Sequence, residues 1–422
     1  MSRDRNSIIV GIDIGSSNIR TIISQQLKGE DQLRIIGVGS IPSLGMRKGV
    51  IIDPDDVAKS INESVEMAQN MAGIKIRKAI VNIGGCDIEF QDSKGVIAIG
   101  RADGEVVEDD INRVISEAQN ISLPINKEIV HIIPRKYRLD DQDNIKNPLG
   151  MKGVRLEVDA LVIENSTTNI KNISKCLYQT NIEIEDVILE PLSAAKSVLS
   201  KKQKELGVVL INMGGGTTSM AVYEEGDLIH TAILPIGAGH ITNDIAIGLR
   251  IPIDMAEKIK LEYGSAVTRD ISKKEGIDLA QIGSNEEGII SRYHVAEIIE
   301  ARLEEIFLLI KKELILIGRS ELLPSGAVLV GGGAKMVHVI DLAKEKLGLP
   351  VQVGFPSGFG GILDKVDDPS FSTVLGLVLW NQEQREYKEG GLSNKLKKLD
   401  PFSSKGGETF ERIKNLFEKF LP

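Results

Sequence analysis

The sequence predicts an α/β protein with two related halves, and three observations lead to this prediction. Apolar runs of strand length alternate with amphipathic segments of helix length through much of the chain. One pattern, an apolar strand followed by a glycine turn and a half-apolar strand, occurs at 9–22 and again at 209–222. The 422 residues are enough for two or three domains with substantial apolar cores.

Composition and charge exclude several classes of protein. Hydrophobic residues make up 42% of the chain and charged residues 26%, which is ordinary for a soluble globular protein. The net charge of −9 and the pI near 5.4 argue against a nucleic-acid-binding protein, which needs a basic face. Cys86 and Cys176 lack zinc-site spacing and indicate a reducing compartment. With no signal peptide and no apolar run near the roughly 20 residues of a spanning helix, we expect a cytosolic protein.

The N-terminal part follows the α/β alternation in order. "SIIVGIDIG" and "RTIISQQL" predict adjacent strands, "DPDDVAKSINESVEMAQNMA" predicts a helix capped near Asp53, and "IRKAIVNIGG" predicts a further strand. From about 86 to 159 the alternation weakens into short β-like pieces around one helix near 107–120. We therefore expect an inserted module in this region.

After the module the alternation resumes. "NISKCLYQTNI" predicts a helix, "IEDVILEP" a strand, 295–317 a long helix with an apolar stripe, and "GAVLVGGGAKM" a buried strand that enters a triple glycine. Beyond Trp380 the chain becomes polar, and segment 382–407 is rich in Gly, Ser and Lys without helical periodicity. We expect a flexible linker there.

The repeated hairpin has the chemistry of a phosphate clamp. Glycines in a turn let the backbone approach an anion and direct N–H groups toward it. Two such turns on facing halves would enclose a nucleotide triphosphate, whereas two unrelated tight turns are the weaker alternative because the pattern is repeated. The turn residues are Gly15, Ser16, Ser17 and Asn18 in the first copy, and Gly214, Gly215, Gly216, Thr217 and Thr218 in the second.

Asp13 in the first hairpin aligns with Asn212 in the second. A single carboxylate suits a hydrated Mg²⁺, which keeps several waters and takes few protein ligands. Asn212 can accept a hydrogen bond but brings no charge. The Walker pattern GxxxxGK[ST] is absent, and neither "GVGSIP" nor "GGGAKM" completes a dinucleotide motif. The sequence therefore predicts a nucleotide site of another type.

Together with "LEPLSAA" at 189–195 and "VLVGGGAKM" at 328–336, the hairpins resemble the nucleotide signature of the actin, sugar-kinase and heat-shock-chaperone superfamily. Within it, the chain is similar over nearly its full length to the bacterial cell-division family FtsA. The resemblance is carried by "IIGVGSIPSLGMRKGVIIDPDD", "VHIIPRKYRLDDQDNIKNPLGMKGVRLEV" and "LPIGAGHITNDIAIGLRIPIDMAEKIK". "IKNPLGMKGVRLEV", which lies in the inserted region, is the most specific stretch.

The resemblance implies an actin-like (ribonuclease H-like) two-lobed ATPase fold with an FtsA-type inserted subdomain. Lobe 1 would comprise 1–83, 160–192 and 361–381, with the insertion at 84–159. Lobe 2 would comprise 193–360, with a smaller subdomain at about 235–305. The linker 382–407 would lead to an amphipathic membrane-targeting helix at 408–422.

The resemblance also assigns residues to ATP and Mg²⁺. Asp13 would hold Mg²⁺ through water, and Glu190 matches the acid that orients the attacking water in some superfamily members. For Glu190 a helix cap beside Pro191 is an equal alternative, and for Met336 a core side chain is a second possibility. Both glycine turns match the phosphate motifs of the superfamily. Glu257 and Lys260 match its ribose and adenine contacts, and the adenosine motif is matched by Gly332, Gly333 and Met336.

Asn212 and Ser219 depart from the pattern of the family, in which acids are common. The loss of a second carboxylate weakens the charge support for Mg²⁺ and for the attacking water. We therefore expect ATP to bind with Mg²⁺ and to be hydrolysed slowly or not measurably. Asn212→Asp is expected to raise a low rate.

The end of the chain predicts an amphipathic helix. Charged residues lie opposite an apolar stripe, and 392–422 holds seven Lys/Arg against four Asp/Glu, a net +3 on a chain of −9. Shallow burial of this stripe in a bilayer is worth several kcal/mol, and its charge suits an anionic leaflet. Packing on its own domain is the alternative, but the resemblance also implies a membrane tether. The stripe is formed by Phe410, Ile413, Leu416, Phe417, Phe420 and Leu421.

The resemblance further implies partners and a location. Family members bind the C-terminal peptide of the tubulin-like ring protein FtsZ through basic residues, and Arg292 and Arg302 occupy matching positions; solvated helix charges are the alternative. It also implies filaments and the recruitment of later division proteins, at the division site on the cytoplasmic face of the membrane. A pilus-assembly ATP-binding scaffold would lack the detached tail, a small-molecule kinase would need an acceptor base, and a chaperone ATPase would need more than the 42 residues after Trp380.

Overall fold

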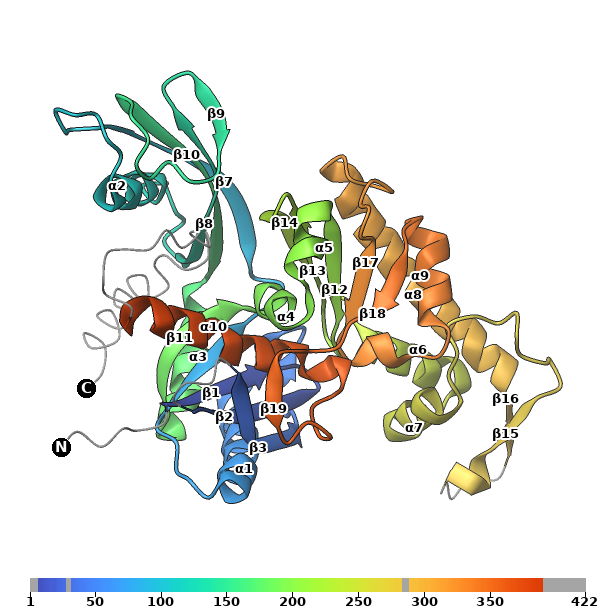
Figure 1. Ribbon diagram of the computed structural model, residues 1–422. Coiled ribbons are helices and arrows are strands. Elements are labelled where there is room, and N and C mark those ends of the chain that lie inside the picture. The colour runs from blue at the N-terminus through green and yellow to red at the C-terminus, as the bar shows by residue number, and fades with distance from the viewer. Residues whose placement is uncertain (1–6, 28–31, 283–287, 390–422) are drawn as a thin grey trace.

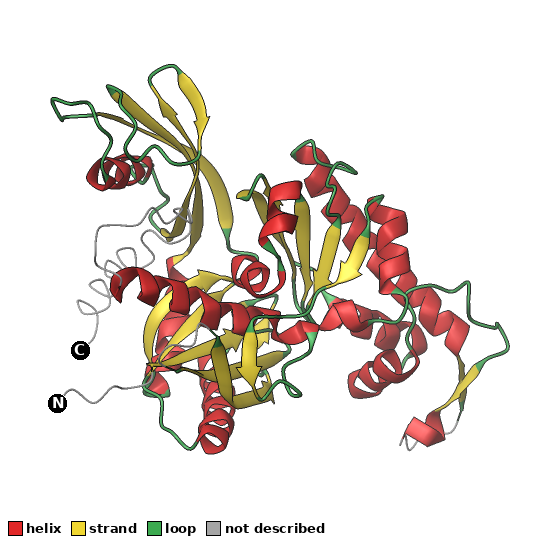
Figure 2. Ribbon diagram, viewed as in Figure 1, coloured by secondary structure: helices red, strands yellow, loops and turns green. Residues whose placement is uncertain are grey.

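The computed structural model describes residues 7–27, 32–282 and 288–389. Two β-sheets form the centres of two lobes, and a third sheet projects from lobe 1 at the upper left of Figure 1. Helices cover the outer faces of both lobes (Figure 2). The lobes meet where the glycine turns of the two hairpins lie.

Lobe 1 is built on a six-stranded sheet in the order β11-β6-β1-β2-β3-β19. β1, β2 and β3 are antiparallel neighbours, and β6 and β11 add in parallel on the other side of β1. The short antiparallel pair β4 (Met46–Arg47) and β5 (Val50–Ile51) follows β3. The strands of the sheet are β1 (Ser7–Ile14), β2 (Asn18–Gln26), β3 (Leu33–Pro42), β6 (Lys78–Ile83), β11 (Glu183–Leu189) and β19 (Phe359–Gly361).

Lobe 2 repeats this strand order. Its sheet runs β14-β13-β12-β17-β18, an antiparallel trio followed by two parallel strands, as in β3-β2-β1-β6-β11. The predicted duplication is therefore confirmed at the level of the whole sheet. The strands are β12 (Val208–Met213), β13 (Thr218–Glu224), β14 (Asp227–Leu234), β17 (Ala327–Val330) and β18 (Val351–Val353).

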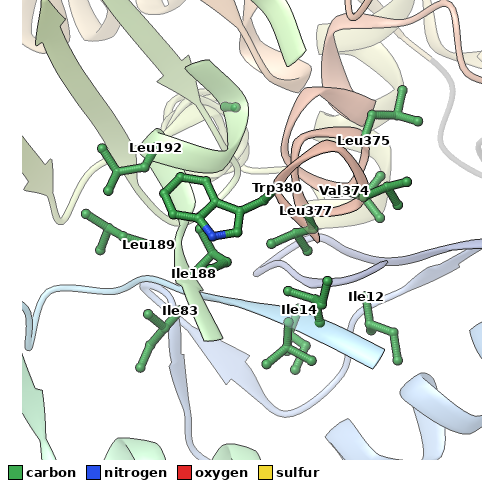
Figure 3. Packing of buried hydrophobic residues seen from close by; sticks show 14 of the residues in the cluster. Ile12, Ile14, Ile83, Ile188, Leu189, Leu192, Val374, Leu375, Leu377 and Trp380 are labelled. Atoms are coloured by element: carbon green, nitrogen blue, oxygen red, sulfur yellow. The ribbon is translucent and has the colours of Figure 1, made fainter. Parts of the chain in front are cut away.

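The helices of lobe 1 begin and end where the sequence signals them. The Asp53 carboxylate accepts hydrogen bonds from the N–H groups of Asp55 and Asp56, which caps α1, and Gly73 ends it in the left-handed conformation. Figure 3 shows Trp380 of α10 between the strand that ends at Leu189 and the apolar side chains of α10. The helices are α1 (Pro54–Ala72), α3 (Thr167–Gln179), α4 (Glu190–Val198), α10 (Ser372–Glu389) and the 3₁₀ turn η3 (Pro369–Phe371).

Helices α4 and α10 cross at very short distance. A Cβ atom on Gly376 would lie 1.7 Å from the carbonyl oxygen of Ser193, so only glycine fits at this position. Two hydroxyl groups add hydrogen bonds across the crossing, from Ser193 Oγ to the Thr373 carbonyl at 2.8 Å and from Ser197 Oγ to the Ser372 carbonyl at 2.6 Å. The two helices therefore form one rigid contact.

The helices of lobe 2 cover a second apolar core. The predicted stripe of the long helix is buried at Val295, Ile299, Leu303, Ile306 and Ile310. A small hairpin, β15 (Gly276–Asp278) with β16 (Ile289–Ser291), precedes this helix. The helices are α5 (Lys201–Leu206), α6 (Ala238–Leu249), α7 (Ile253–Tyr263), α8 (Arg292–Leu316) and α9 (Val339–Leu347), with the 3₁₀ turns η1 (Leu279–Ile282) and η2 (Gly332–Lys335).

The inserted module is a four-stranded sheet, β7-β10-β8-β9, with α2 (Glu108–Ala118) packed on it. The outer halves of β8 and β10 form a small core of their own, whereas the inner halves carry Val130 and Ile163 into the core of lobe 1. The predicted end of the module at 159 is too early, because the apolar strand continues without a turn residue to Ser166. The strands are β7 (Glu89–Ala98), β8 (Lys127–Leu139), β9 (Gln142–Ile145) and β10 (Arg155–Ser166).

The predicted linker also begins too early. Residues 382–389 belong to α10, because "QEQREYKE" consists of helix-forming residues without Gly or Pro, even though it has no apolar stripe. The remainder of the linker and the predicted helix 408–422 lie outside the described residues. Among the helices that are described, none is long and apolar enough to cross a membrane.

Candidate functional site

The two glycine turns are in contact between the lobes. A Cβ atom on Gly215 would lie 1.8 Å from Ser17 Oγ, and one on Gly216 would lie 2.7 Å from Ser16 Oγ. The turns have the same internal hydrogen bond, from Gly15 N–H to the Asn18 carbonyl at 3.2 Å and from Gly214 N–H to the Thr217 carbonyl at 3.0 Å. The structure therefore brings the two predicted phosphate motifs together.

Helix α6 begins against the second turn. The N–H groups of Ala238 and Gly239 donate to the carbonyls of Gly214 and Gly215, both at 2.8 Å. A Cβ atom on Gly237 would lie 2.5 Å from the Gly214 carbonyl oxygen, which explains the glycine at this position. The start of a helix thus adjoins the turn, and its dipole adds positive potential there.

Asp13 lies at the end of β1 in a buried polar setting. Asn82 Nδ2 donates to Asp13 Oδ1 at 2.7 Å, and Asn82 Oδ1 accepts from Ile14 N–H at 2.7 Å, so one side chain holds both the carboxylate and the backbone of the turn. Burial raises the pKa of Asp13 to about 6, although Arg20 and Asn82 lower it. A cation beside this carboxylate would offset its desolvation, which is the setting that suits Mg²⁺.

Arg20 and Asn82 were missed in the sequence analysis. Arg20 pairs with Asp13 across the hairpin, with Nη1 3.8 Å from Oδ2, and its guanidinium lies 5.2 Å from the centre of the Phe371 ring. Its Nε is buried and has no hydrogen-bond partner among the described residues. The sequence could have indicated the role of Arg20, because an arginine in an otherwise apolar strand lies opposite Asp13 in the predicted hairpin. The environment of Asn82 depends on β6 lying beside β1, which no local pattern shows.

Glu190 is the first residue of α4, and its carboxylate crosses to lobe 2. Oε1 accepts hydrogen bonds from Asn212 Nδ2 and, at 3.0 Å, from Ser219 Oγ. Asn212 Nδ2 also donates to Thr373 Oγ1 at 3.3 Å. Asn212 was considered as a hydrogen-bond acceptor, but its amide is a donor here. Asn212 and Ser219, the two residues that depart from the family pattern, therefore both act as neutral hydrogen-bond donors to Glu190.

The environment of Glu190 favours its protonated form more than water does. Burial raises the pKa of Glu190 to about 7, the negative charge of Asp13 adds to this, and the bonds from Ser219 and Asn212 lower it. Leu189 is the N-cap residue of α4, so the Glu190 side chain is not the cap. It instead links the connecting helix to β12 and β13.

The residues predicted to bind ribose and adenine lie at the end of lobe 2 that carries the second glycine turn. Buried Lys260 donates to Glu257 Oε2 at 2.6 Å, to Thr242 Oγ1 at 2.8 Å and to the Ala238 carbonyl at 3.4 Å. Gly333 of η2 faces Met213 and Ala238, and Gly332 next to it is open. Met336 is partly buried against the core of lobe 2, beside Gly264.

Arg292 and Arg302 lie on α8, each paired within the chain. Arg292 Nη1 lies 2.5 Å from Glu275 Oε1, and its Nε donates to the Tyr263 carbonyl at 3.0 Å. Arg302 forms a bidentate pair with Asp244, at 2.5 and 2.8 Å, and also bonds Glu305; the bond to Asp244 is the main reason that its pKa is raised. An acidic partner would therefore have to compete with internal carboxylates.

Two family models match this chain. The family model for "Cell division protein FtsA" matches residues 209–376, and the model for "SHS2 domain inserted in FTSA" matches residues 85–164. The second match coincides with the inserted sheet and confirms an FtsA-type insertion.

Curated relatives match most of the chain. Cell division protein FtsA of Bacillus subtilis is 40% identical over 375 residues, covering 89% of this chain and 83% of that protein. The protein of the same name from Pseudomonas aeruginosa is 38% identical over 378 residues, 90% of each chain. The one from Borreliella burgdorferi is 36% identical over 407 residues, 96% of this chain and 98% of that protein.

Solved structures confirm the predicted actin-like fold. The PilM-PilN type IV pilus biogenesis complex matches with a TM-score of 0.66 and 16% identity, over 89% of this chain and 98% of that chain. MreB5 of Spiroplasma citri bound to ADP matches with a TM-score of 0.53 and 15% identity, over 91% and 99%. At this identity the structures define the fold, whereas the curated relatives define the family. This chain belongs to the cell division protein FtsA family.

Proposed function

We propose that this protein binds ATP and Mg²⁺ between its lobes and forms actin-like filaments that anchor the FtsZ ring to the cytoplasmic face of the membrane. Through this role at the division site it would also help recruit later division proteins. Family membership supports the role in division. The observation that carries the nucleotide part is the contact of the two glycine turns beside the buried carboxylate of Asp13.

The chain offers a group for each part of the nucleotide. Backbone N–H groups of both turns would hold the phosphates, and Asp13 would hold Mg²⁺ through water. The polar cluster of Glu257 and Lys260 would contact the ribose and adenine, with Gly332, Gly333 and Met336 beside the purine. A fold neighbour solved with bound ADP, MreB5, is consistent with this assignment.

Hydrolysis is proposed to be slow. A water-orienting acid has to accept a hydrogen bond from the attacking water, and because Oε1 of Glu190 already accepts from Asn212 and Ser219, only Oε2 is left for this role. A steady-state rate of phosphate release near the typical enzyme value of about 10 per second, measured with and without filaments, would refute this point.

The nucleotide site is tested by Asp13→Asn. Equilibrium binding of a fluorescent ATP analogue with Mg²⁺ should weaken at least tenfold, because the charge that holds the metal is lost. Asp341→Asn, which removes the charge of a half-buried carboxylate on α9 that pairs with Arg269 and His338, is the matched control and should bind as the unmodified protein does. Unchanged affinity in Asp13→Asn would reject the proposed site.

Binding to the FtsZ C-terminal peptide is tested with two arginines that each pair with a carboxylate, one on α8 and one just beyond it. Arg302→Glu should weaken the binding measured by fluorescence anisotropy by roughly 1 to 3 kcal/mol if a charge-assisted bond is lost. Arg319, three residues beyond the end of α8, forms a similar bidentate pair with Glu224, so Arg319→Glu is the control. Equal effects of both variants would reject a specific contact at Arg302.

Membrane attachment rests on the sequence of 408–422. Sedimentation with anionic vesicles should recover the full chain, and Phe417→Glu should leave most of it in the supernatant because a charge is placed in the apolar stripe. Co-sedimentation of Phe417→Glu equal to that of the unmodified chain would reject the tether.

A pilus-assembly scaffold is a weaker alternative, since the PilM-PilN match has 16% identity against 36–40% for the three FtsA relatives above. A small-molecule kinase is weaker still. Coupling ATP consumption to a panel of sugars would detect one.

A further inference from the structure

His131 is a buried histidine that belongs to the inserted module but contacts the centre of lobe 1. It lies on β8 with 8% of its surface exposed. Its Nε2 accepts a hydrogen bond from the backbone N–H of Leu189 at 3.0 Å. Its ring also lies 6.3 Å from that of Trp380 on α10, at an angle of 50°. One side chain of the insertion therefore touches the segment β11–α4 and helix α10 together.

The bond to Leu189 requires a neutral imidazole. An imidazolium has donors at both nitrogens, so it cannot accept from an N–H group. Burial lowers the pKa of His131 to about 4, which keeps the ring neutral at neutral pH. The proton then resides on Nδ1 and the lone pair of Nε2 faces Leu189.

Leu189 lies where strand β11 leads into helix α4. It is the last residue of β11 and the N-cap residue of α4, and Glu190 follows it directly. Leucine has no polar side chain with which to cap the helix, so the direction of this turn depends on backbone contacts. Within this turn the chain orients the Glu190 carboxylate toward Asn212 and Ser219 of lobe 2.

We infer that His131 is a positioning residue for Glu190: by accepting the Leu189 N–H, it holds the Glu190 carboxylate within reach of Asn212 and Ser219, and so makes the inserted module part of the nucleotide site. This inference rests on the proposed binding of ATP between the lobes. It adds a residue that the phosphate and adenosine motifs do not contain.

The test is a double-mutant cycle on the full chain, with affinity for a fluorescent, non-hydrolysable ATP analogue and Mg²⁺ as the readout. Loss of one buried hydrogen bond corresponds to about a fivefold effect, so His131→Leu should weaken binding by about that factor. His131→Gln, whose Oε1 can accept from Leu189, should stay within about twofold of the unmodified protein. In the Glu190→Gln background, His131→Leu should add less than about twofold, because the residue through which it acts has been changed.

A purely structural role predicts a different result. His131→Leu would then weaken binding equally in both backgrounds, and this result would overturn the inference. His230 is a part-buried histidine of β14 that bonds Glu313, so His230→Leu is the matched control and should leave the affinity unchanged. If the unmodified protein does not bind the analogue at all, the proposed function fails rather than this inference.

A measurement on the unmodified side chain covers the case in which His131→Leu does not fold. In protein labelled with ¹⁵N-histidine, the Nε2 resonance of His131 should shift when the analogue binds. The shift should shrink in Glu190→Gln when each protein is measured at saturation with the analogue. A resonance that does not move on saturation with the analogue would overturn the inference.

Discussion

Replacing Asn212 by aspartate would remove the amide that donates to Glu190 and would place two carboxylates face to face in the buried lobe interface. In the structure Asn212 Nδ2 donates to Glu190 Oε1 and to Thr373 Oγ1, and Asn212 itself is 9% exposed. The carboxylate of an aspartate has no donor to offer. Unless a proton is taken up, the new pair is repulsive.

The magnitude follows from two contributions. The lost hydrogen bond to a charged group is worth about 2 kcal/mol. Two like charges about 4 Å apart at an effective dielectric constant near 20 repel by about 4 kcal/mol. Glu190 has a pKa of about 7, so taking up a proton at pH 8 costs only about 1.4 kcal/mol, and this limits the contribution of the repulsion at that pH. We therefore expect Asn212→Asp to lower the free energy of unfolding by about 3 kcal/mol at pH 8, in the absence of nucleotide and metal.

The loss should shrink in acid, and the sign follows from proton uptake. The pair has a folded-state pKa raised above that of a free carboxyl group, as Glu190 alone already has at about 7. The folded state therefore binds more protons than the unfolded state, and its stability rises as the pH falls through that pKa. Each pH unit recovers about 1.4 kcal/mol only while the variant binds one proton more than the unmodified protein, so the loss should shrink to about 2 kcal/mol at pH 7 and change little below that, where Glu190 of the unmodified protein is protonated as well.

Urea unfolding followed by the fluorescence of Trp380, the single tryptophan, measures these values. The decisive variant combines Asn212→Asp with Glu190→Gln, because the glutamine amide can then donate to the new aspartate and the polarity of the bond is exchanged. This double variant should regain most of the stability lost at pH 8. A loss below about 1 kcal/mol in Asn212→Asp, or a double variant no more stable than it, would contradict the donor role of Asn212.

Three further predictions concern other parts of the molecule. The free energy of unfolding should fall by up to about 3 kcal/mol between pH 6.5 and pH 4 because of His131, whose lowered folded-state pKa makes the unfolded state bind more protons; in His131→Gln this contribution should be absent from the pH profile. Gly376→Ala should cost about 1 to 3 kcal/mol in urea unfolding because of the clash at the helix crossing, whereas Gly100→Ala, where a Cβ meets nothing within 4 Å, should be neutral. Asn82→Ala should weaken the binding of the ATP analogue with Mg²⁺ by about tenfold, since two buried hydrogen bonds hold Asp13 and its turn, and unchanged affinity would contradict this.

Local patterns were sufficient for the hairpins, the capped helix α1 and the long helix α8, because each depends on residues close in sequence. The paired turns were predictable for the same reason, since the glycine pattern is repeated. The partners of Asn212 were not, because Glu190 and Thr373 reach it from helices that are distant in sequence. Two boundaries were also predicted too early, the end of the inserted module and the start of the linker. β10 and α10 continue past these positions because no residue there ends a strand or a helix.

The crossing of α4 and α10 limits how these two helices can move. Backbones that touch through Gly376 and Ser193 cannot slide past each other, so motion of α10 relative to α4 is restricted to rotation about this point. Thr373, near the pivot, contacts Asn212, and from Gly376 α10 extends to Glu389, a lever of about 20 Å. A rotation of about 5° at the pivot would swing the far end of α10 by about 2 Å, so a small displacement of Thr373 by Asn212 would be larger at Glu389.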